Sequence, residues 1–432
     1  FSLGWNVARE NFWKPLESVV NQFKLRGSWG ELGNQNTSNL YPFYEILPVK
    51  SNSGNWLVNG GKTNTADIPS LVSTLLTWER VRSFNVGFDF GAFSNRLTGS
   101  FDYFVRKTVD MVGPAPQLPL VLGIAPAIVN NADMKSYGFE IELSWRDRIG
   151  EVDYGVKFNL ADAQQKVVKY PNTTNAFNDW YAGKMSGEIW GYTSLGIAKT
   201  DEEMKEHLAS LPNGGQNQLG NKWGAGDIMY ADINGDGKVD GGKGTLADPG
   251  DQRIIGNSTP RYNFGLVLDA SYKGFDVSIF FQGVGKRDYA PIVGTNGAVF
   301  WGAVNNIWQS MAMEEHFDYF RPEGHPMGAN LNGYYPRPDF TSNKNHQVQT
   351  RYLQDASYIR LKNLQIGYTL PKQWINKLHI NRCRVYVSGD NLWTGTSLAS
   401  MFDPETLAAG DWGSGKTYPL SKVISFGLNV NF

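Results

Sequence analysis

The 432-residue chain has little of what several protein classes need. Its single cysteine, Cys383, excludes a framework of internal disulfide bonds. No run of roughly 18 or more apolar residues occurs, which excludes membrane-spanning helices. The formal net charge of −1 gives no electrostatic basis for binding nucleic acid. The five histidines are scattered, and neither an HExxH nor a GxSxG motif is present, so nothing indicates an enzyme.

Aromatic residues and glycine are abundant: aromatics make up 13% of the chain, and there are 48 glycines. The final segment, YPLSKVISFGLNVNF, has apolar side chains from Ile424 to Phe432 alternating with small polar ones. Side chains alternate between the two faces of a strand, so this pattern predicts a strand with one apolar face. Outer-membrane β-barrels usually finish on such a strand with a terminal aromatic residue, and we interpret Phe432 as that barrel-assembly signal. The last strand of a soluble sandwich alternates in the same way.

The same alternation recurs along the chain and predicts about eleven strands, with short turns near residues 94–95, 149–150 and 273–274. The strands run for about ten residues, enough to cross a bilayer when tilted, whereas soluble strands average roughly five or six. Long connections rich in glycine and aromatic residues are expected on the other side, at 35–76, 113–133, 169–259, 285–354 and 395–421. This asymmetry matches the short periplasmic turns and long extracellular loops of outer-membrane barrels.

We therefore predict an all-β fold, an antiparallel transmembrane β-barrel with long extracellular loops. An odd number of strands with two free edges would leave backbone groups unsatisfied in lipid. The largest transporters of this kind close at about 22 strands around a plug, so residues 1–432 are expected to form about half of a barrel. Because Phe1 lies in an alternating segment, FSLGWNVA, we interpret the chain as the C-terminal part of a longer barrel protein.

The strongest local motif lies in the connection 169–259. Residues 232–243 have the spacing of an EF-hand-type Ca²⁺ loop, with Asp232 at position 1. Position 7 of this loop would contribute the backbone carbonyl of Lys238. Position 12, normally a glutamate, is Lys243, so the loop needs a further carboxylate, for which Asp248 and Asp251 are candidates. We expect a structural Ca²⁺ or similar hard cation, and the alternative is a turn cluster without metal. The oxygen-bearing side chains at positions 1, 3, 5 and 9 are Asp232, Asn234, Asp236 and Asp240.

Aromatic side chains in the long connections are candidates for contacts with a substrate or a partner. Their flat faces could stack on sugars or line a partner surface, and the alternative for each is packing within the loops or anchoring at the membrane interface. The candidates are Trp180, Tyr181, Trp190, Tyr192, Phe300, Trp301, Trp308 and Trp412.

Several segments occur in the order typical of one family. They include LRGSWGELGNQN (25–36), LTWERVRSFNVGFDF (76–90), GDIMYADINGDGKVD (226–240), ASYIRLKNLQIGYTLP (356–371) and the terminal strand. Together they resemble the C-terminal part of a SusC/RagA-like TonB-dependent outer-membrane transporter of the Bacteroidetes type. The resemblance implies a 22-stranded barrel in the bacterial outer membrane, an N-terminal plug that contacts TonB, and a SusD-like lipoprotein lid. It also implies that the family's acidic loop corresponds to residues 232–240.

The first functional hypothesis is TonB-dependent active import of large nutrients, oligosaccharides or peptides, without a reaction of its own. The expected partners are the lid lipoprotein, TonB through the N-terminal region, membrane lipid and the N-terminal half of the same barrel, but not nucleic acid. The alternative is a SusC-like barrel that serves as a structural subunit of an envelope complex without transport. A third hypothesis is a secreted all-β protein that binds Ca²⁺ and carbohydrate.

Overall fold

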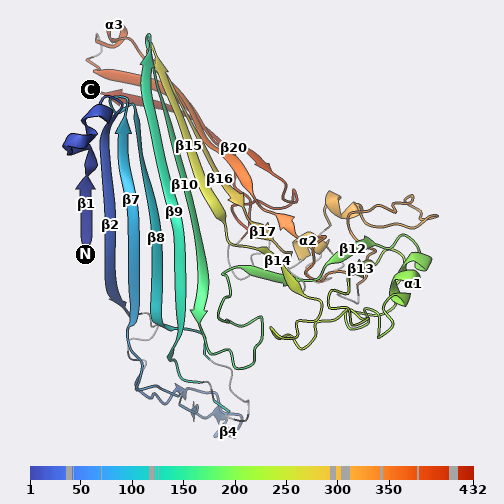
Figure 1. The fold of residues 1–432 in the computed structure, drawn as a ribbon. Coiled ribbons are helices and arrows are strands. Elements are labelled where there is room, and N and C mark those ends of the chain that lie inside the picture. The colour runs from blue at the N-terminus through green and yellow to red at the C-terminus, as the bar shows by residue number, and fades with distance from the viewer. Residues whose placement is uncertain are drawn as a thin grey trace.

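A single antiparallel sheet of eleven strands dominates the molecule. The computed structural model describes residues 1–35, 41, 43–69, 71–115, 121, 123–124, 126–291, 298–302, 312–340, 344–376, 379–407 and 417–432. Neighbouring strands follow one another along the chain, and Figure 1 shows them side by side as one curved wall. The all-β architecture predicted from the alternation is confirmed. In order, the strands are β1 (Ser2–Asn6), β2 (Val20–Asn34), β7 (Glu79–Ala92), β8 (Leu97–Val112), β9 (Asn130–Ile149), β10 (Val152–Lys169), β15 (Arg261–Tyr272), β16 (Phe275–Lys286), β19 (Tyr358–Thr369), β20 (Arg382–Thr396) and β21 (Val423–Asn431).

Short connections join the strands at one end of the sheet and long ones at the other, as predicted (Figure 1). Gly150 and Gly274 adopt positive φ in two of the short turns, a conformation that glycine reaches without steric cost. The expected loop 113–133 is shorter than predicted, because β9 begins at Asn130 and its first residues pair with β8. The short side also holds the 3-10 helices η1 (Val7–Arg9) and η2 (Asn11–Leu16) and the helix α3 (Lys372–Ile375). The long connections are 35–78, 113–129, 170–260, 287–357 and 397–422.

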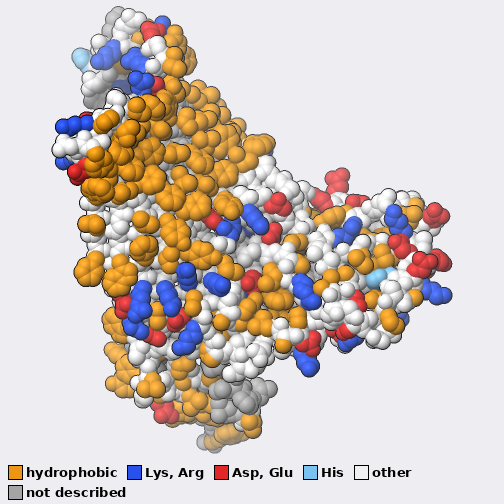
Figure 2. All heavy atoms as spheres, viewed as in Figure 1, with side chains coloured by type: hydrophobic (Ala, Val, Ile, Leu, Met, Phe, Trp, Pro, Cys, Tyr) orange, Lys and Arg blue, Asp and Glu red, His pale blue; other side chains and the backbone are white. Residues whose placement is uncertain are grey.

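One face of the sheet is apolar and uncovered. Phe84, Leu143, Ile366 and Phe426, on four different strands, are each more than a third exposed. Among the described residues, the remaining sheets are two-stranded and lie within the long connections, so no second sheet packs on this face. Figure 2 shows the apolar side chains as a band over the part of the sheet nearer the short turns. A long strand with an uncovered apolar face is what a barrel presents to lipid.

The opposite face is polar, and its charges are paired between strands. The Arg26 guanidinium on β2 lies 2.8 Å from carboxylate oxygens of both Asp89 on β7 and Asp102 on β8. Near the other edge of the sheet, Arg384 on β20 forms an ion pair with Asp276 on β16. Charged side chains in the middle of membrane-length strands require water or a counter-charge, so this face suits a hydrated lumen.

The long connections 170–260, 287–357 and 397–407 fold together into what we call the loop layer. All fourteen buried residues of the main hydrophobic core belong to it, whereas the apolar sheet face remains outside that core. None of the helices in the described residues is long and apolar enough to span a membrane. The layer contains β11 (Glu188–Gly191) paired with β14 (Arg253–Asn257), β12 (Ser194–Ile197) with β13 (Ile228–Tyr230), β17 (Asp288–Tyr289) with β18 (Gln354–Asp355), and the helices α1 (Asp201–Ala209), α2 (Ala298–Trp301) and η7 (Glu314–Phe317).

The connection 35–78 is separate from the loop layer and lies beyond the ends of β2 and β7 (Figure 1). It forms two small ladders, in which β3 (Val49–Lys50) pairs with β6 (Thr65–Ala66) and β4 (Leu57–Val58) pairs with β5 (Gly61–Lys62). Several of its large apolar side chains are exposed, among them Trp56 and Leu57.

Candidate functional site

A pocket lies in the loop layer beside its hydrophobic core, and we call it the loop pocket. Its volume is about 350 Å³, a size suited to a small ligand or to a few side chains. Most of the wall is apolar, with aromatic, proline and methionine side chains, and the few polar groups come from histidine, arginine and tyrosine. The wall includes Trp301, Met313, His316, Phe317, Tyr319, Tyr335, Arg337, Phe340 and His346.

Two buried nitrogen atoms in the wall have no hydrogen-bond partner, Nε1 of Trp301 and Nδ1 of His346. The two rings lie against each other with centroids 4.5 Å apart. Burial lowers the pKa of His346 to about 4, so its imidazole is neutral near pH 7. A neutral imidazole offers one donor and one acceptor, and the Trp301 indole offers a donor. Unpaired polar atoms in a buried wall are costly unless a ligand or water satisfies them.

His316 joins two elements of the pocket wall. Its Nδ1 accepts a hydrogen bond from the backbone N–H of Met313 at 3.0 Å, which caps η7. Its Nε2 lies 3.1 and 3.2 Å from the carbonyl oxygens of Val299 and Phe300 in α2. Because Nδ1 accepts, we assign the proton to Nε2, which donates to these carbonyls. The ring therefore links α2 to η7, and both elements contribute residues to the pocket wall.

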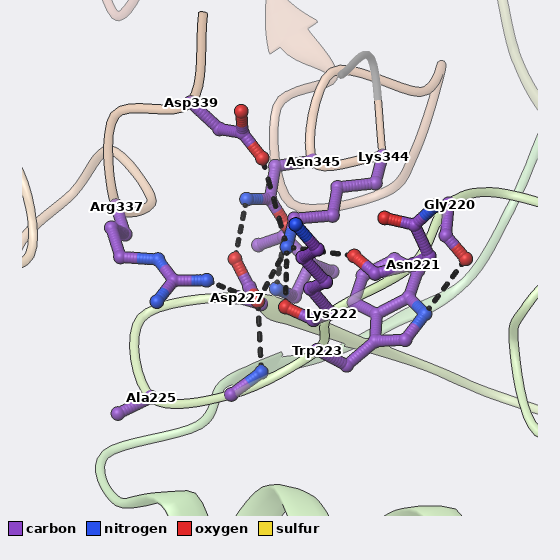
Figure 3. A network of polar contacts seen from close by, with 12 residues as sticks. Gly220, Asn221, Lys222, Trp223, Ala225, Asp227, Arg337, Asp339, Lys344 and Asn345 are labelled. Carbon is purple, nitrogen blue, oxygen red and sulfur yellow. Dashed lines mark hydrogen bonds and ion pairs between the residues drawn. The ribbon is translucent and has the colours of Figure 1, made fainter. Parts of the chain in front are cut away.

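A buried ion network joins the two largest connections of the loop layer (Figure 3). The Asp227 carboxylate is completely buried and lies 2.8 Å from the Nζ of Lys344, which is only 1% exposed. The same carboxylate accepts hydrogen bonds from Arg337 at 2.8 Å and from the side-chain amide of Asn345 at 2.9 Å. Arg337 also lines the loop pocket, so the network ties the wall of the pocket to residues 224–228.

Lys344 fills its remaining hydrogen-bonding capacity with backbone carbonyls and an indole face. Its Nζ donates to the carbonyl oxygens of Asn221 and Lys222 at 3.3 and 3.0 Å. It also lies 5.1 Å from the centroid of the Trp223 ring. Both residues are drawn in Figure 3. A buried charge requires this number of partners, because an unpaired ammonium would cost several kcal/mol (~3–5) in such a position.

The predicted loop aromatics divide into separate places. Tyr192 and Trp301 belong to the same buried core, together with Phe300, and only Trp301 lines the loop pocket. Trp190 instead stacks on Phe177 with centroids 4.6 Å apart. The remaining described candidates make other contacts within the same connection: Trp180 packs edge-on against Tyr170, and the Tyr181 hydroxyl donates to Glu188. Trp308 and Trp412 lie outside the described residues.

The acidic loop forms a compact turn in which carboxylates accept backbone N–H groups. Asp232 accepts from Gly235 and Gly237, at 2.7 and 2.8 Å. Asp251, predicted as a possible extra ligand, accepts from three backbone N–H groups, although burial raises its pKa. The Lys238 ammonium forms an ion pair with Asp240, the position where a cation would act.

The described residues contain no group of three or more His, Cys, Asp or Glu side chains arranged to hold a metal ion. The amide of Asn234 and backbone carbonyls supply oxygen atoms beyond that set, so the donor chemistry still suits a hard cation. Such a cation would have to displace the Lys238 ammonium from Asp240. Ca²⁺ binding by residues 232–240 therefore stays a prediction.

Several residues of the site were not predicted from the sequence. His316, His346, Asp227 and Lys344 are single polar residues in long connections, with no spacing that points to one another. The run YYPRPDF at 334–340 is the local signal that could have been noticed, because dense aromatic and proline residues in a loop often form a packed surface. Phe432, the predicted assembly signal, follows β21 and is 81% exposed.

Known proteins share this architecture. Residues 1–392 match the family model described as TonB dependent receptor-like, beta-barrel. TonB-dependent receptor P3 of Formosa agariphila is 29% identical over 100% of this chain and 41% of its own length. TonB-dependent receptor SusC of Bacteroides thetaiotaomicron is 22% identical over 100% of this chain and 39% of its own length.

A solved structure of the RagAB peptide transporter matches the fold with a TM-score of 0.72 at 23% identity. It covers 100% of this chain and 43% of that one, so the chain spans about two fifths of the length of these relatives. The eleven-stranded sheet thus corresponds to part of such a barrel. The chain belongs to the TonB-dependent receptor β-barrel family, an outer-membrane family of transporters rather than enzymes, and is SusC/RagA-like.

Proposed function

We propose that the chain forms the C-terminal half of a 22-stranded barrel that imports large nutrients across the bacterial outer membrane. The observation behind the proposal is the loop pocket, which lies in the layer formed by the long connections of a membrane wall. A preformed apolar pocket with a few unpaired polar atoms is the usual form of a ligand site. On the loop side of the barrel it would meet nutrients before they enter the lumen.

Peptides are the substrate class that the pocket chemistry favours. Apolar walls can accept an apolar side chain, while the Trp301 and His346 nitrogens can pair with a peptide backbone. The relative RagAB is described as a peptide transporter, which supports the same choice. Oligosaccharides are the second class, because aromatic faces such as that of Tyr319 could stack on sugar rings.

The proposed partners complete the barrel and drive it. β1 and β21 lie at the two edges of the sheet, and unpaired edge strands are not tolerated in hydrocarbon. We propose that further strands of the same protein close the barrel, that a plug fills it, and that TonB acts through an N-terminal region. A SusD-like surface lipoprotein would cover the loop layer, and RagAB is the relative that supports this pairing.

The test uses a strain that lacks the whole gene and is complemented with the full-length gene. Uptake of fluorescent oligopeptides and oligosaccharides is measured in the deletion strain and in both complemented strains, wild type and F317A/F340A. These two pocket residues are 56% and 61% exposed, so their removal should leave the fold intact. We expect several-fold slower peptide uptake, with the W374A variant, which changes an exposed aromatic on the short-turn side, as the matched control.

Different outcomes separate the hypotheses. Equal uptake of both labels with and without the gene would contradict import and favour the structural role in an envelope complex. Loss of oligosaccharide uptake alone would contradict the choice of peptides while supporting transport.

A further inference from the structure

Four cations stand side by side across four neighbouring strands at the loop-side end of the sheet. Arg82 on β7 faces Lys107 on β8, and Lys107 faces Lys135 on β9. Lys135 in turn faces Lys166 on β10. Directly facing residues of an antiparallel pair project to the same face, so these side chains form one line, which we call the basic row. Strands lie about 4.8 Å apart, and the row therefore extends over roughly 14 Å.

The basic row lies on the apolar, lipid-facing side of the sheet. Two residues closer to the short turns, Phe84 faces Val105 and Val105 faces Tyr137, in the same three strands. Residues two apart share a face, so the cations continue the lipid-facing columns. Figure 2 shows Lys and Arg side chains gathered directly on the loop side of the apolar band. The step between the two levels is about 7 Å along the strand.

This depth corresponds to the boundary between hydrocarbon and headgroups. Apolar and aromatic side chains mark the hydrocarbon and its interface, and the next level outward is that of the lipid headgroups. The long connections mark the outer leaflet side. The row therefore faces headgroups of the outer leaflet and not the lumen, and at Lys166, which pairs with Met185, it borders the loop layer.

The positive charge of the row is only partly balanced within the chain. Arg82 pairs with Glu31 at 2.6 Å, and Lys107 lies 3.5 Å from Asp133. Among the described residues, Lys135 and Lys166 form no ion pair, and Lys135 only lies over the Tyr137 ring at 5.3 Å. Like charges that face each other directly across strands are destabilising. The three lysines on the neighbouring strands β8, β9 and β10 therefore favour the binding of an anion from outside the chain.

We infer that the basic row binds phosphate groups on lipid headgroups of the outer leaflet. A line of ammonium groups spaced by the strand separation suits several phosphates of neighbouring lipids, and clusters of Lys and Arg at a membrane surface attract anionic lipid. The bound lipid would relieve the repulsion in the row and order the shell around the barrel. The inference rests on the membrane placement of the sheet and is independent of the transported substrate.

The test measures binding of diphosphorylated lipid A to the full-length protein in detergent by native mass spectrometry. The variant K107Q/K135Q/K166Q removes three of the cations, and we expect its affinity for the lipid to fall by roughly tenfold or more. The matched control, K24Q/K157Q/K205Q, removes the same charge from exposed lysines on the lumen face and on α1, and should bind as the wild type does. Heat-modifiable gel migration reports whether the triple variant folds. If it does not fold, the single variant K135E replaces it in the test and should also weaken lipid binding.

Two further arms identify the source of the phosphate. Lipid A without its phosphates should bind the wild type and the triple variant equally. Millimolar inorganic phosphate should not displace the phosphorylated lipid. Equal binding of phosphorylated lipid by wild type and triple variant, equal loss in the control, or displacement by free phosphate would each overturn the inference.

Discussion

His346 is the side chain whose protonation should matter most to the loop layer. Burial lowers its pKa to about 4, whereas an unfolded histidine titrates near 6.5. The unfolded state therefore binds the proton more tightly, and the stability that comes from the neutral ring is complete above about pH 6.5 and falls as the pH drops toward 4. The full effect is of the order of 3 kcal/mol.

We predict that hydrogen exchange in residues 344–352 becomes faster between pH 7 and pH 4.5, after correction for the intrinsic exchange rate. The variant H346Q keeps a polar side chain of similar size without the titration, and its protection should change much less over the same range. His207 titrates in the same direction because burial also lowers its pKa, so exchange in α1 serves as an internal comparison. Equal pH dependence in wild type and H346Q would contradict the assignment.

The acidic loop gives a second prediction at this scale. Isothermal titration of chelator-treated full-length protein should detect Ca²⁺ binding that is lost in D236N, because in the predicted site Asp236 would contribute a ligand oxygen at position 5. Removing the competing ammonium in K238A should strengthen binding, since Asp240 then becomes free for the cation. E202Q, which removes an exposed carboxylate from α1, is the control. Absence of binding up to millimolar Ca²⁺ would leave the loop as a turn cluster held by backbone hydrogen bonds.

At the scale of elements, the Asp227 network should decide whether the two main connections of the loop layer stay together. K344M keeps the aliphatic stem but removes the ammonium from a buried carboxylate, and it should destabilise the layer by about 3 kcal/mol. Limited proteolysis within 220–231 and 337–349 is the measurement. The double variant D227N/K344M should lose less than the sum of the single changes, because neither partner is left charged.

The control for this network is an exposed ion pair at a short turn. Lys273 and Glu151 lie 2.8 Å apart but are both about three-fifths exposed. K273M should leave the rate of proteolysis close to that of the wild type, because water screens an exposed pair. Equal proteolysis of K344M and K273M would contradict a stabilising role for the buried network.

Strand alternation gives a prediction about β9. L143R places a charge on the lipid-facing side and should cost about 2–4 kcal/mol, or prevent assembly, since the guanidinium would enter hydrocarbon. S144R places the same group on the lumen side one residue later, where polar side chains already line the wall. Heat-modifiable gel migration of extracted outer membranes compares the two. Normal assembly of L143R would argue that this face does not contact lipid.

The elements of the sheet could be predicted from the sequence, and the contacts of the loop layer could not. Apolar and polar residues that alternate with period two indicate which side of a strand faces water. This pattern therefore predicts the strands and their short turns without any long-range information. The start of β9 was missed because residues 130–136 are mostly polar, and pairing with β8 extends the strand there. Asp227 and Lys344 lie 117 residues apart, and only the folded connections bring them together.

At the scale of the whole molecule, the chain is ordered along the membrane normal. An apolar band lies nearer the short turns, the basic row follows it, and the loop layer with its own core continues from the long connections (Figures 1 and 2). A soluble sandwich would place its apolar face against a second sheet, and here the main hydrophobic core lies elsewhere. This separation is the physical basis for treating the sheet as a membrane wall.

The measurement that tests this claim most directly is the oxygen accessibility of nitroxide labels along β9 in the C383S background, with the full-length protein in lipid bilayers. We predict high oxygen accessibility for labels at Ile141 and Leu143, which face lipid, and high accessibility to a water-soluble nickel reagent at Glu140 and Glu142, which face the lumen. Nickel accessibility at all four positions, or protection from both reagents at Ile141 and Leu143, would contradict the account.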